Sequence, residues 1–455
     1  MNLLLSAYAC DPTRGSEEGT GFHWLWQAAT LGHEVWCLTT PRGRTRLQER
    51  LAERAADPAA GRIHLVFVTV PPAVEFLYRW QLGVYLHYVA WQYRAWRAAR
   101  RLDAEVNFGA VHHVTYNSLQ MASWLWRLKK PLLLGPLGGG MTAPAVLRRY
   151  LPNWFKTETV RTAISRLLIA FDPNVRQSLR HASLVLAANG DTATLARRLG
   201  APRVELAMSA ALPDSYFPAA YAPRPPLAGR ELRILWLARL FPRKGLQLVL
   251  DALGQVDPRV KFHLDVMGDG PVGPLVPGWI AAAGLQDRVT WHGSVPYEAT
   301  RNAYLGHDLF MLCSLRDTYA NQYLEAMALG LPILTLNHHG AADFIPAAAG
   351  LKVPVRSANE TTGALARAVE HFHDHPAVLE QMGRAGFAYA AQFAVSKLVA
   401  GLYQRAAAAA PALAGLVSEA LDKETITKKG NPAERGEAFL SPAGSGQVII
   451  NSLLR

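Results

Sequence analysis

The sequence is poor in cysteine and in long apolar runs. Its 455 residues include three cysteines, Cys10, Cys37 and Cys313, and none of them forms a Cys-x-x-Cys pair. We therefore expect buried free thiols in a reducing compartment rather than a disulfide framework. No segment reaches the roughly 18 apolar residues that a membrane-spanning helix needs. The short apolar start NLLLSAYA lacks the basic flank of a signal peptide. These absences predict a cytoplasmic protein.

Two common ligand-binding patterns are also missing. The loop at 9–21, ACDPTRGSEEGTG, contains glycines but not the Gly-x-Gly-x-x-Gly spacing of NAD- and FAD-binding proteins. The sequence HFHDH at 371–375 has the composition of a metal site. Because alternate residues of a helix point apart, it predicts the surface end of a helix instead.

Acidic residues are scarce in the first half of the chain. Net charge is +12, and residues 1–220 hold 25 Lys and Arg against 15 Asp and Glu, which is +10. A basic surface attracts phosphorylated metabolites, nucleic acid or anionic lipid headgroups, and a merely solvated surface is the alternative. The predicted helix at 74–102 mixes tryptophans and tyrosines with arginines, of which Arg94, Arg97 and Arg101 share one face. Such a helix can lie at a membrane interface, or pack on its domain with arginine stems over apolar surface.

The order of elements predicts an α/β protein. A chain of this length fits two or three domains, and strand-like and helix-like stretches alternate in both halves. We therefore expect two doubly wound, Rossmann-like sheets that face each other across a cleft. The predicted boundaries are a first domain at 1–213, a proline-rich linker at 214–230, a second domain at 231–395, a closing helix at 396–410 and a polar, disordered tail at 411–455.

Charged residues in the second half follow predicted strands. Asp317 comes after the apolar stretch that ends at Leu312, and Glu325 lies on the helix behind it. Arg239 and Lys244 lie in the turn after an earlier strand, in the pattern Arg-Leu-x-x-x-Lys-Gly. Because ligands collect at the carboxyl ends of parallel strands, these side chains are candidates for binding an anion. Solvated charges on a helix and a loop are the alternative interpretation.

In the first half, His112 and His113 end a predicted strand, where a histidine can act as a base or hold a hydroxyl. Gly15 and Ser16 lie at a strand-to-helix turn, where backbone N–H groups can approach a phosphate. A core histidine and a tight turn are the simpler alternatives.

Several motifs together resemble the family 4 glycosyltransferases of the GT-B fold, in the branch that makes bacterial exopolysaccharides. The resemblance covers about residues 1–408. It rests on strings from both halves, namely MNLLLSAYACDPTRGSEEGTG, HEVWCLTT, HHVTYNS, GPLGGG, LARLFPRKGL, MGDGP, WHG and LEAMALGLP.

The resemblance implies a role for each candidate residue. Arg239 and Lys244 would hold the donor diphosphate, Glu325 the ribose hydroxyls, and Asp317 the donor sugar. His113, or His112 in its place, would contact the sugar or diphosphate, and Gly15 and Ser16 would give backbone N–H groups to the phosphate. Gly293 and Ser294 would line the base pocket. The family pattern has Glu where this chain has Asp317, so we expect an altered sugar contact.

The implied activity is transfer of a sugar from a nucleotide sugar to a saccharide or lipid-linked acceptor, with retention of configuration. No Asp-x-Asp pair is available for a divalent metal, so we expect neither metal nor other cofactor. No nucleic-acid partner is expected, whereas an anionic membrane surface at the inner face is. The alternatives are a nucleotide-sugar or polyanion-binding protein without turnover, and a GT-B enzyme that uses a sugar phosphate.

Overall fold

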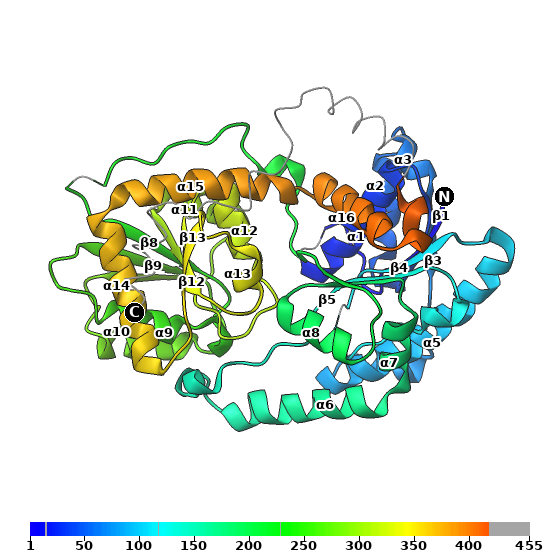
Figure 1. Ribbon diagram of the computed structural model, residues 1–455, viewed down its shortest axis with the longest axis horizontal. Helices are drawn as coiled ribbons and strands as arrows, with labels where there is room; N and C mark the ends of the chain where they lie inside the picture. Colours follow the sequence, from blue (N-terminus) through cyan, green and yellow to red (C-terminus); the bar gives the residue numbers. More distant parts are fainter. Residues whose placement is uncertain (14–15, 117, 228, 418–455) are drawn as a thin grey trace. The chain divides into compact units, whose positions relative to one another are not determined.

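The computed structural model describes residues 1–13, 16–116, 118–227 and 229–417 (Figure 1). The chain divides into two compact units. The first comprises residues 1–140, residues 163–209 and the C-terminal helix from Val395, and the second comprises residues 141–162 and 210–394. Each unit is built on a parallel sheet.

The first unit has the strand order β3-β2-β1-β4-β5-β6-β7. Its strands are β1 (Asn2–Ser6), β2 (Glu34–Thr39), β3 (Ile63–Phe67), β4 (Ala110–His113), β5 (Leu132–Leu137), β6 (Leu184–Ala187) and β7 (Val204–Leu206). Its helices are α1 (Ser16–Thr30), α2 (Arg44–Glu53), α3 (Pro58–Gly61), α4 (Pro72–Leu77), α5 (Gln81–Val106), α7 (Pro173–His181), α8 (Gly190–Arg198) and α16 (Val395–Ala409). Helix α6 (Arg161–Phe171) leads into this unit from the second.

The central strands of this sheet are apolar because helices cover both of their faces. Leu3, Leu4 and Leu5 of β1 are fully buried, as are the leucines at the start of β5. Continuous apolar strands of this kind are typical of parallel sheets. Figure 1 shows α1 and α16 on one side of β4 and β5, and α5 and α7 on the other.

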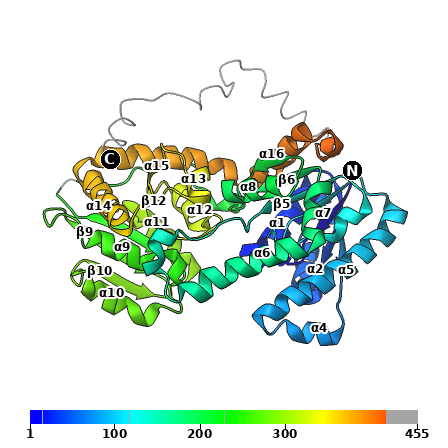
Figure 2. The same cartoon turned by 60° about the horizontal axis from the view of Figure 1, so that its bottom comes forward.

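The second unit has the strand order β10-β9-β8-β11-β12-β13. Its strands are β8 (Leu232–Leu237), β9 (Phe262–Met267), β10 (Val289–Gly293), β11 (Leu309–Met311), β12 (Ile333–Leu336) and β13 (Gly350–Val353). Its helices are α9 (Leu246–Leu253), α10 (Val276–Ala282), α11 (Tyr297–Gly306), α12 (Asn321–Ala328), α13 (His339–Phe344), α14 (Ala358–Asp374) and α15 (Pro376–Ala390). Helix α9 packs on α14 and α12 packs on α15 (Figure 2).

Both sheets are thus doubly wound in the Rossmann manner, as the sequence predicts. In each sheet the chain reverses its direction of growth between the first strand and the fourth. These two switch points are the gap between β1 and β4 and the gap between β8 and β11. Most of the predicted site residues end or follow these four strands, whereas Gly293 and Ser294 lie at the end of β10.

Two boundaries differ from the prediction. The segment Met141–Thr162, which we placed in the first domain, packs with the second unit. Its buried Glu158 forms an ion pair with Arg316, and Tyr150 donates a hydrogen bond to Asp251 at 2.9 Å. Residues 411–416, which we assigned to a disordered tail, form a 3-10 helix in which Leu413 and Leu416 are fully buried. The remainder of that tail, from residue 418, lies outside the described residues.

Cys10, Cys37 and Cys313 are buried and free, which confirms the prediction for the cysteines. Among the described residues, no helix is both long enough and apolar enough to cross a membrane.

Candidate active site

Two loops meet at the switch point of the second sheet, one after β8 and one after β11. Their contact is backbone to backbone, because the amide of Leu315 donates to the carbonyl oxygen of Arg243 at 2.7 Å. Gly245 has a positive φ of 71°, and a Cβ atom there would lie 2.1 Å from the carbonyl oxygen of Cys313. Only glycine therefore fits at 245. The Lys-Gly pair of the sequence motif holds the two loops against each other.

The contact of the loops brings opposite charges together. The carboxylate of Asp317 forms ion pairs with Lys244 and, at 3.3 Å, with Arg243, and it accepts a hydrogen bond from Ser314 at 3.3 Å. Burial alone raises the pKa of Asp317, but the charges of Lys244 and Arg243 outweigh it and lower the pKa below its usual value. Asp317 is therefore ionised, and the Lys244 ammonium is held beside it.

Arg239 lies in the same turn but is exposed. Its guanidinium lies 4.8 Å from the centre of the Phe241 ring, and within the described residues it has no acidic partner. The structure thus joins Lys244 to Asp317 and leaves the Arg239 charge available to a ligand.

Glu325 lies on α12, and its carboxylate accepts a hydrogen bond from Tyr304 of α11 at 2.7 Å. Burial raises the pKa of Glu325, and the hydrogen bond from Tyr304 only partly opposes this. A half-buried carboxylate with one neutral partner keeps further acceptor capacity, which suits hydrogen bonding to ligand hydroxyl groups.

Gly293 and Ser294 follow β10. Gly293 has a φ of 68°, and its carbonyl oxygen accepts a hydrogen bond from Gly268 at 2.7 Å. Gly268 in turn approaches β8 so closely that a Cβ atom there would lie 1.9 Å from the carbonyl oxygen of Ala238. Ser294 is exposed. The base-binding role of Gly293 and Ser294 stays a prediction.

His112 and His113 end β4, at the switch point of the first sheet, and both are almost fully buried. His112 donates to the carbonyl oxygen of Gly135 at 3.0 Å and accepts from the Tyr403 hydroxyl at 3.1 Å. The nitrogens of His113 lie 3.0 Å from the Ser6 hydroxyl and 3.1 Å from the Tyr88 hydroxyl. Burial lowers the pKa of His112 to about 3 and that of His113 to about 4, so both rings are neutral.

Every ring nitrogen of the two histidines thus has a partner within the first unit. The donor contact that we predicted for His113 or His112 stays a prediction, and it requires the exchange of one of these internal hydrogen bonds. Of the predicted phosphate-binding pair, Gly15 lies outside the described residues. Ser16 begins α1, and its side chain is likewise not described.

Within the described residues, no cluster of three or more histidine, cysteine or carboxylate side chains could hold a metal ion. The HFHDH sequence ends α14, as predicted, and Asp374 pairs there with Arg259 at 2.7 Å.

Several residues at the site were not predicted from the sequence. Arg243 and Ser314 both contact Asp317, and Tyr304 contacts Glu325. Arg243 is next to Lys244, so the run of two basic residues was a usable signal. Tyr304 lies 21 positions before Glu325, and no sequence pattern links the two.

Residues 231–371 match the family model described as glycosyl transferases group 1. Over 205 residues the chain is 27% identical to a putative colanic acid biosynthesis glycosyltransferase, WcaL, of Escherichia coli, covering 43% of this chain and 50% of WcaL. It is 30% identical over 147 residues to the GPI3 subunit of a phosphatidylinositol N-acetylglucosaminyltransferase of Saccharomyces cerevisiae, covering 30% of this chain and 32% of that subunit. The chain therefore spans about half the length, or less, of these curated relatives.

Solved structures extend the likeness to both units. Sucrose-phosphate synthase of Thermosynechococcus elongatus aligns with a TM-score of 0.61 at 18% identity, over 90% of this chain and 100% of that one. The fold is GT-B. Anabaena HepE, solved in complex with UDP, aligns with a TM-score of 0.56 at 15% identity, again over 90% and 100% of the two chains.

Proposed function

We propose that the protein is a glycosyltransferase that moves a sugar from a nucleotide sugar to a saccharide or lipid-linked acceptor, with retention of configuration and without a metal ion. The observation that carries the proposal is the cationic site at the switch point of the second sheet, where Lys244 and Arg243 surround Asp317 beside the exposed Arg239. The match of residues 231–371 to group 1 glycosyltransferases supports it.

The chemistry of the reaction accounts for this charge. As the bond from the anomeric carbon to the diphosphate breaks, negative charge grows on the leaving oxygen, and fixed cations close to it lower the barrier. In our assignment Arg239 and Lys244 bind the diphosphate, Asp317 holds Lys244 in place and accepts from the sugar hydroxyls, and Glu325 accepts from the ribose. Since cationic side chains supply the positive charge, we expect the activity to persist in EDTA.

Retention is proposed to follow from displacement on one face of the sugar. The acceptor oxygen bonds to the anomeric carbon on the side that the diphosphate leaves, and the acceptor proton passes to a leaving phosphate oxygen. No dedicated nucleophile takes part in this scheme. A glycosyl-enzyme adduct trapped and seen by mass spectrometry would contradict it.

Transfer of a radiolabelled sugar from a panel of nucleotide sugars tests the proposal. We expect one donor to be turned over, and the Lys244→Ala and Glu325→Ala variants to lose that activity. Arg259→Ala is the control, because it removes an exposed ion pair with Asp374, and both of these residues lie outside the two loops. Tight donor binding without turnover would show instead a nucleotide-sugar-binding protein, and turnover only with a sugar-phosphate acceptor would point to the other alternative.

The acceptor is proposed to be a cell-envelope or exopolysaccharide precursor, since WcaL is named for colanic acid biosynthesis. A membrane-bound acceptor fits the surface of α4 and α5. Six large apolar side chains there are 42% to 59% exposed: Phe76, Trp80, Tyr85, Leu86, Val89 and Tyr93. Residues 76–102 contain five arginines and no acidic residue.

This surface has the composition of a membrane-interface helix rather than a solvated one. The Arg79 guanidinium lies 4.6 Å from the centre of the Phe76 ring, and that of Arg97 lies 5.9 Å from the centre of the Tyr93 ring. Arginines therefore lie beside aromatic rings on this surface. We propose that it binds the anionic inner face of the membrane. In a flotation assay, wild type should rise with anionic vesicles at low salt, and a Leu86→Ser, Val89→Ser variant should stay at the bottom. Wild type that stays at the bottom contradicts the proposal.

A further inference from the structure

The carboxylate of Glu325 lies against one face of α11. Tyr297, Arg301 and Tyr304 are spaced at i, i+4 and i+7, and residues so spaced share one side of a helix. Tyr304 donates to Glu325 at 2.7 Å. The face of α11 that meets Glu325 therefore also presents Arg301.

Arg301 holds a residue from a distant part of the second unit, Tyr216. The Arg301 guanidinium donates to the carbonyl oxygen of Tyr216 at 2.6 Å and lies 5.1 Å from the centre of its ring. Tyr216 ends a single 3-10 turn, Asp214–Tyr216, in the segment that leads into β8. Its ring is thus fixed on the same face of α11 as Glu325.

The hydroxyl of Tyr216 is buried, and among the described residues it has no hydrogen-bond partner. Burial raises the pKa of this phenol most, and the charge of Glu325 raises it further. A buried hydroxyl without a partner costs free energy and calls for an explanation, and a ligand that supplies the missing bond is one such explanation.

Tyr221, five residues on, shows the contrasting case. Its hydroxyl donates to the carboxylate of Glu380 at 2.8 Å, and its ring packs over Gly330, where a Cβ atom would lie 2.6 Å from it. The hydroxyl of Tyr221 is therefore hydrogen-bonded within the fold, whereas among the described residues the hydroxyl of Tyr216 donates to no acceptor.

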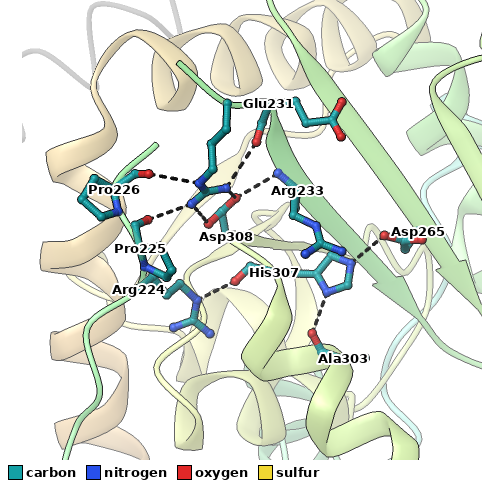
Figure 3. Close-up of polar contacts among 10 residues, drawn as sticks. Arg224, Pro225, Pro226, Glu231, Arg233, Asp265, Ala303, His307 and Asp308 are labelled. Carbon is teal, nitrogen blue, oxygen red and sulfur yellow. Dashed lines mark hydrogen bonds and ion pairs between the residues drawn. The ribbon is translucent and has the colours of Figure 1, made fainter. Parts of the chain in front are cut away.

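Arg224, in the same segment, links the two helices that carry Tyr304 and Glu325. It donates to the carbonyl oxygens of Tyr304 and His307 at the end of α11 and of Leu329 and Gly330 after α12, at 2.5 to 3.3 Å. Figure 3 shows the contact of Arg224 with His307, beside Asp308. Because α11 carries Tyr304 and α12 carries Glu325, one arginine holds both helices at the spacing that their hydrogen bond needs.

We propose that Tyr216 is a further ligand-binding residue beside Glu325, and that its hydroxyl hydrogen-bonds a hydroxyl of the nucleotide's pentose ring. The inference rests on the proposed function, since the pentose belongs to the nucleotide-sugar donor. Glu325 then accepts from one hydroxyl of the pentose while Tyr216 donates to another.

The test compares Tyr216→Phe with Tyr221→Phe by calorimetric binding of UDP, GDP and ADP and by thermal unfolding. For the nucleotide that wild type binds, Tyr216→Phe should raise Kd about 3- to 10-fold, the worth of one neutral hydrogen bond. Its Tm should stay the same or rise, because an unpartnered hydroxyl has been removed. Tyr221→Phe should lower Tm and leave Kd unchanged.

Removing hydroxyl groups from the ligand completes a double-mutant cycle between Tyr216 and the pentose. With the 2′-deoxy and 3′-deoxy forms of the same nucleotide, the difference between wild type and Tyr216→Phe should disappear for one of them. Equal Kd values for wild type and Tyr216→Phe with the full nucleotide would overturn this inference alone. Failure of wild type to bind any of the nucleotides would overturn it together with the proposed function.

Discussion

The two sheets share one strand order, yet the polar side chains at their switch points are used in different ways. After β4 of the first sheet, His112 and His113 are buried, neutral and bonded at every ring nitrogen to groups of their own unit. After β8 and β11 of the second sheet, cations outnumber acids around Asp317, Arg239 is exposed, and Glu325 has a single neutral partner.

The difference separates structural from ligand-facing polar groups. A buried polar group whose hydrogen bonds are all made within the fold stabilises that fold. A charge or an acceptor atom that lacks a partner at a switch point is instead available to a ligand. On this criterion we expect the second sheet to carry the donor site, and the histidine pair of the first sheet to act mainly on stability.

The largest effect is expected at Lys244. Lys244→Met keeps the buried stem but removes the ammonium, so the leaving diphosphate loses a fixed cation and kcat/KM should fall about 100-fold or more. Steady-state transfer assays measure this loss. His113→Gln, assayed in parallel, should retain activity within about threefold if its ring is structural; an equal loss in both variants would erase the distinction between the two switch points.

The second effect is on acid stability. His113 has a pKa of about 4 in the fold, below the ordinary value of 6.5, so the unfolded chain takes up the proton first as pH falls. Its contribution to stability is present above pH 6.5 and is lost between pH 6.5 and about 4, a loss on the order of 2 to 3 kcal/mol at pH 4.5. Urea unfolding at pH 7 and 4.5 should show a smaller loss for His113→Gln than for wild type. Identical losses would contradict the assignment.

A smaller pH dependence of stability, with the opposite sign, is expected from Glu325, whose pKa is raised by burial. Its contribution to stability is greatest below the unfolded value of 4.5 and is lost as pH rises through the folded pKa. Glu325→Gln should therefore match or exceed the Tm of wild type at pH 7 while its nucleotide Kd rises about tenfold. A lower Tm with unchanged Kd would make Glu325 a structural residue.

Much of the architecture could be predicted from the sequence, because apolar runs bounded by glycine and proline mark strands that are buried on both faces. The positions of Lys244 and Asp317 after two strands of one sheet followed from the same pattern. Their mutual ion pair did not, since strand ends predict where side chains lie and not which charges neutralise one another. Tyr304 meets Glu325, and Tyr216 meets Arg301 of the same helix, only through tertiary packing.

The segment Met141–Thr162 shows a further limit. Its sequence continues the basic first half, yet the ion pair of Glu158 with Arg316 and the hydrogen bond of Tyr150 with Asp251, 158 and 101 positions apart, tie it to the second unit. Contacts of that separation leave no periodic signal. The burial of Leu413 and Leu416 was missed for a similar reason, because a polar stretch follows them in the sequence.

Hydrogen–deuterium exchange with and without the bound nucleoside diphosphate distinguishes a donor site on the second sheet from one on the first. We expect protection of residues 239–246 and 314–326, with little change at residues 110–113. Protection confined to 110–113, with the two loops of the second sheet unchanged, would contradict this expectation.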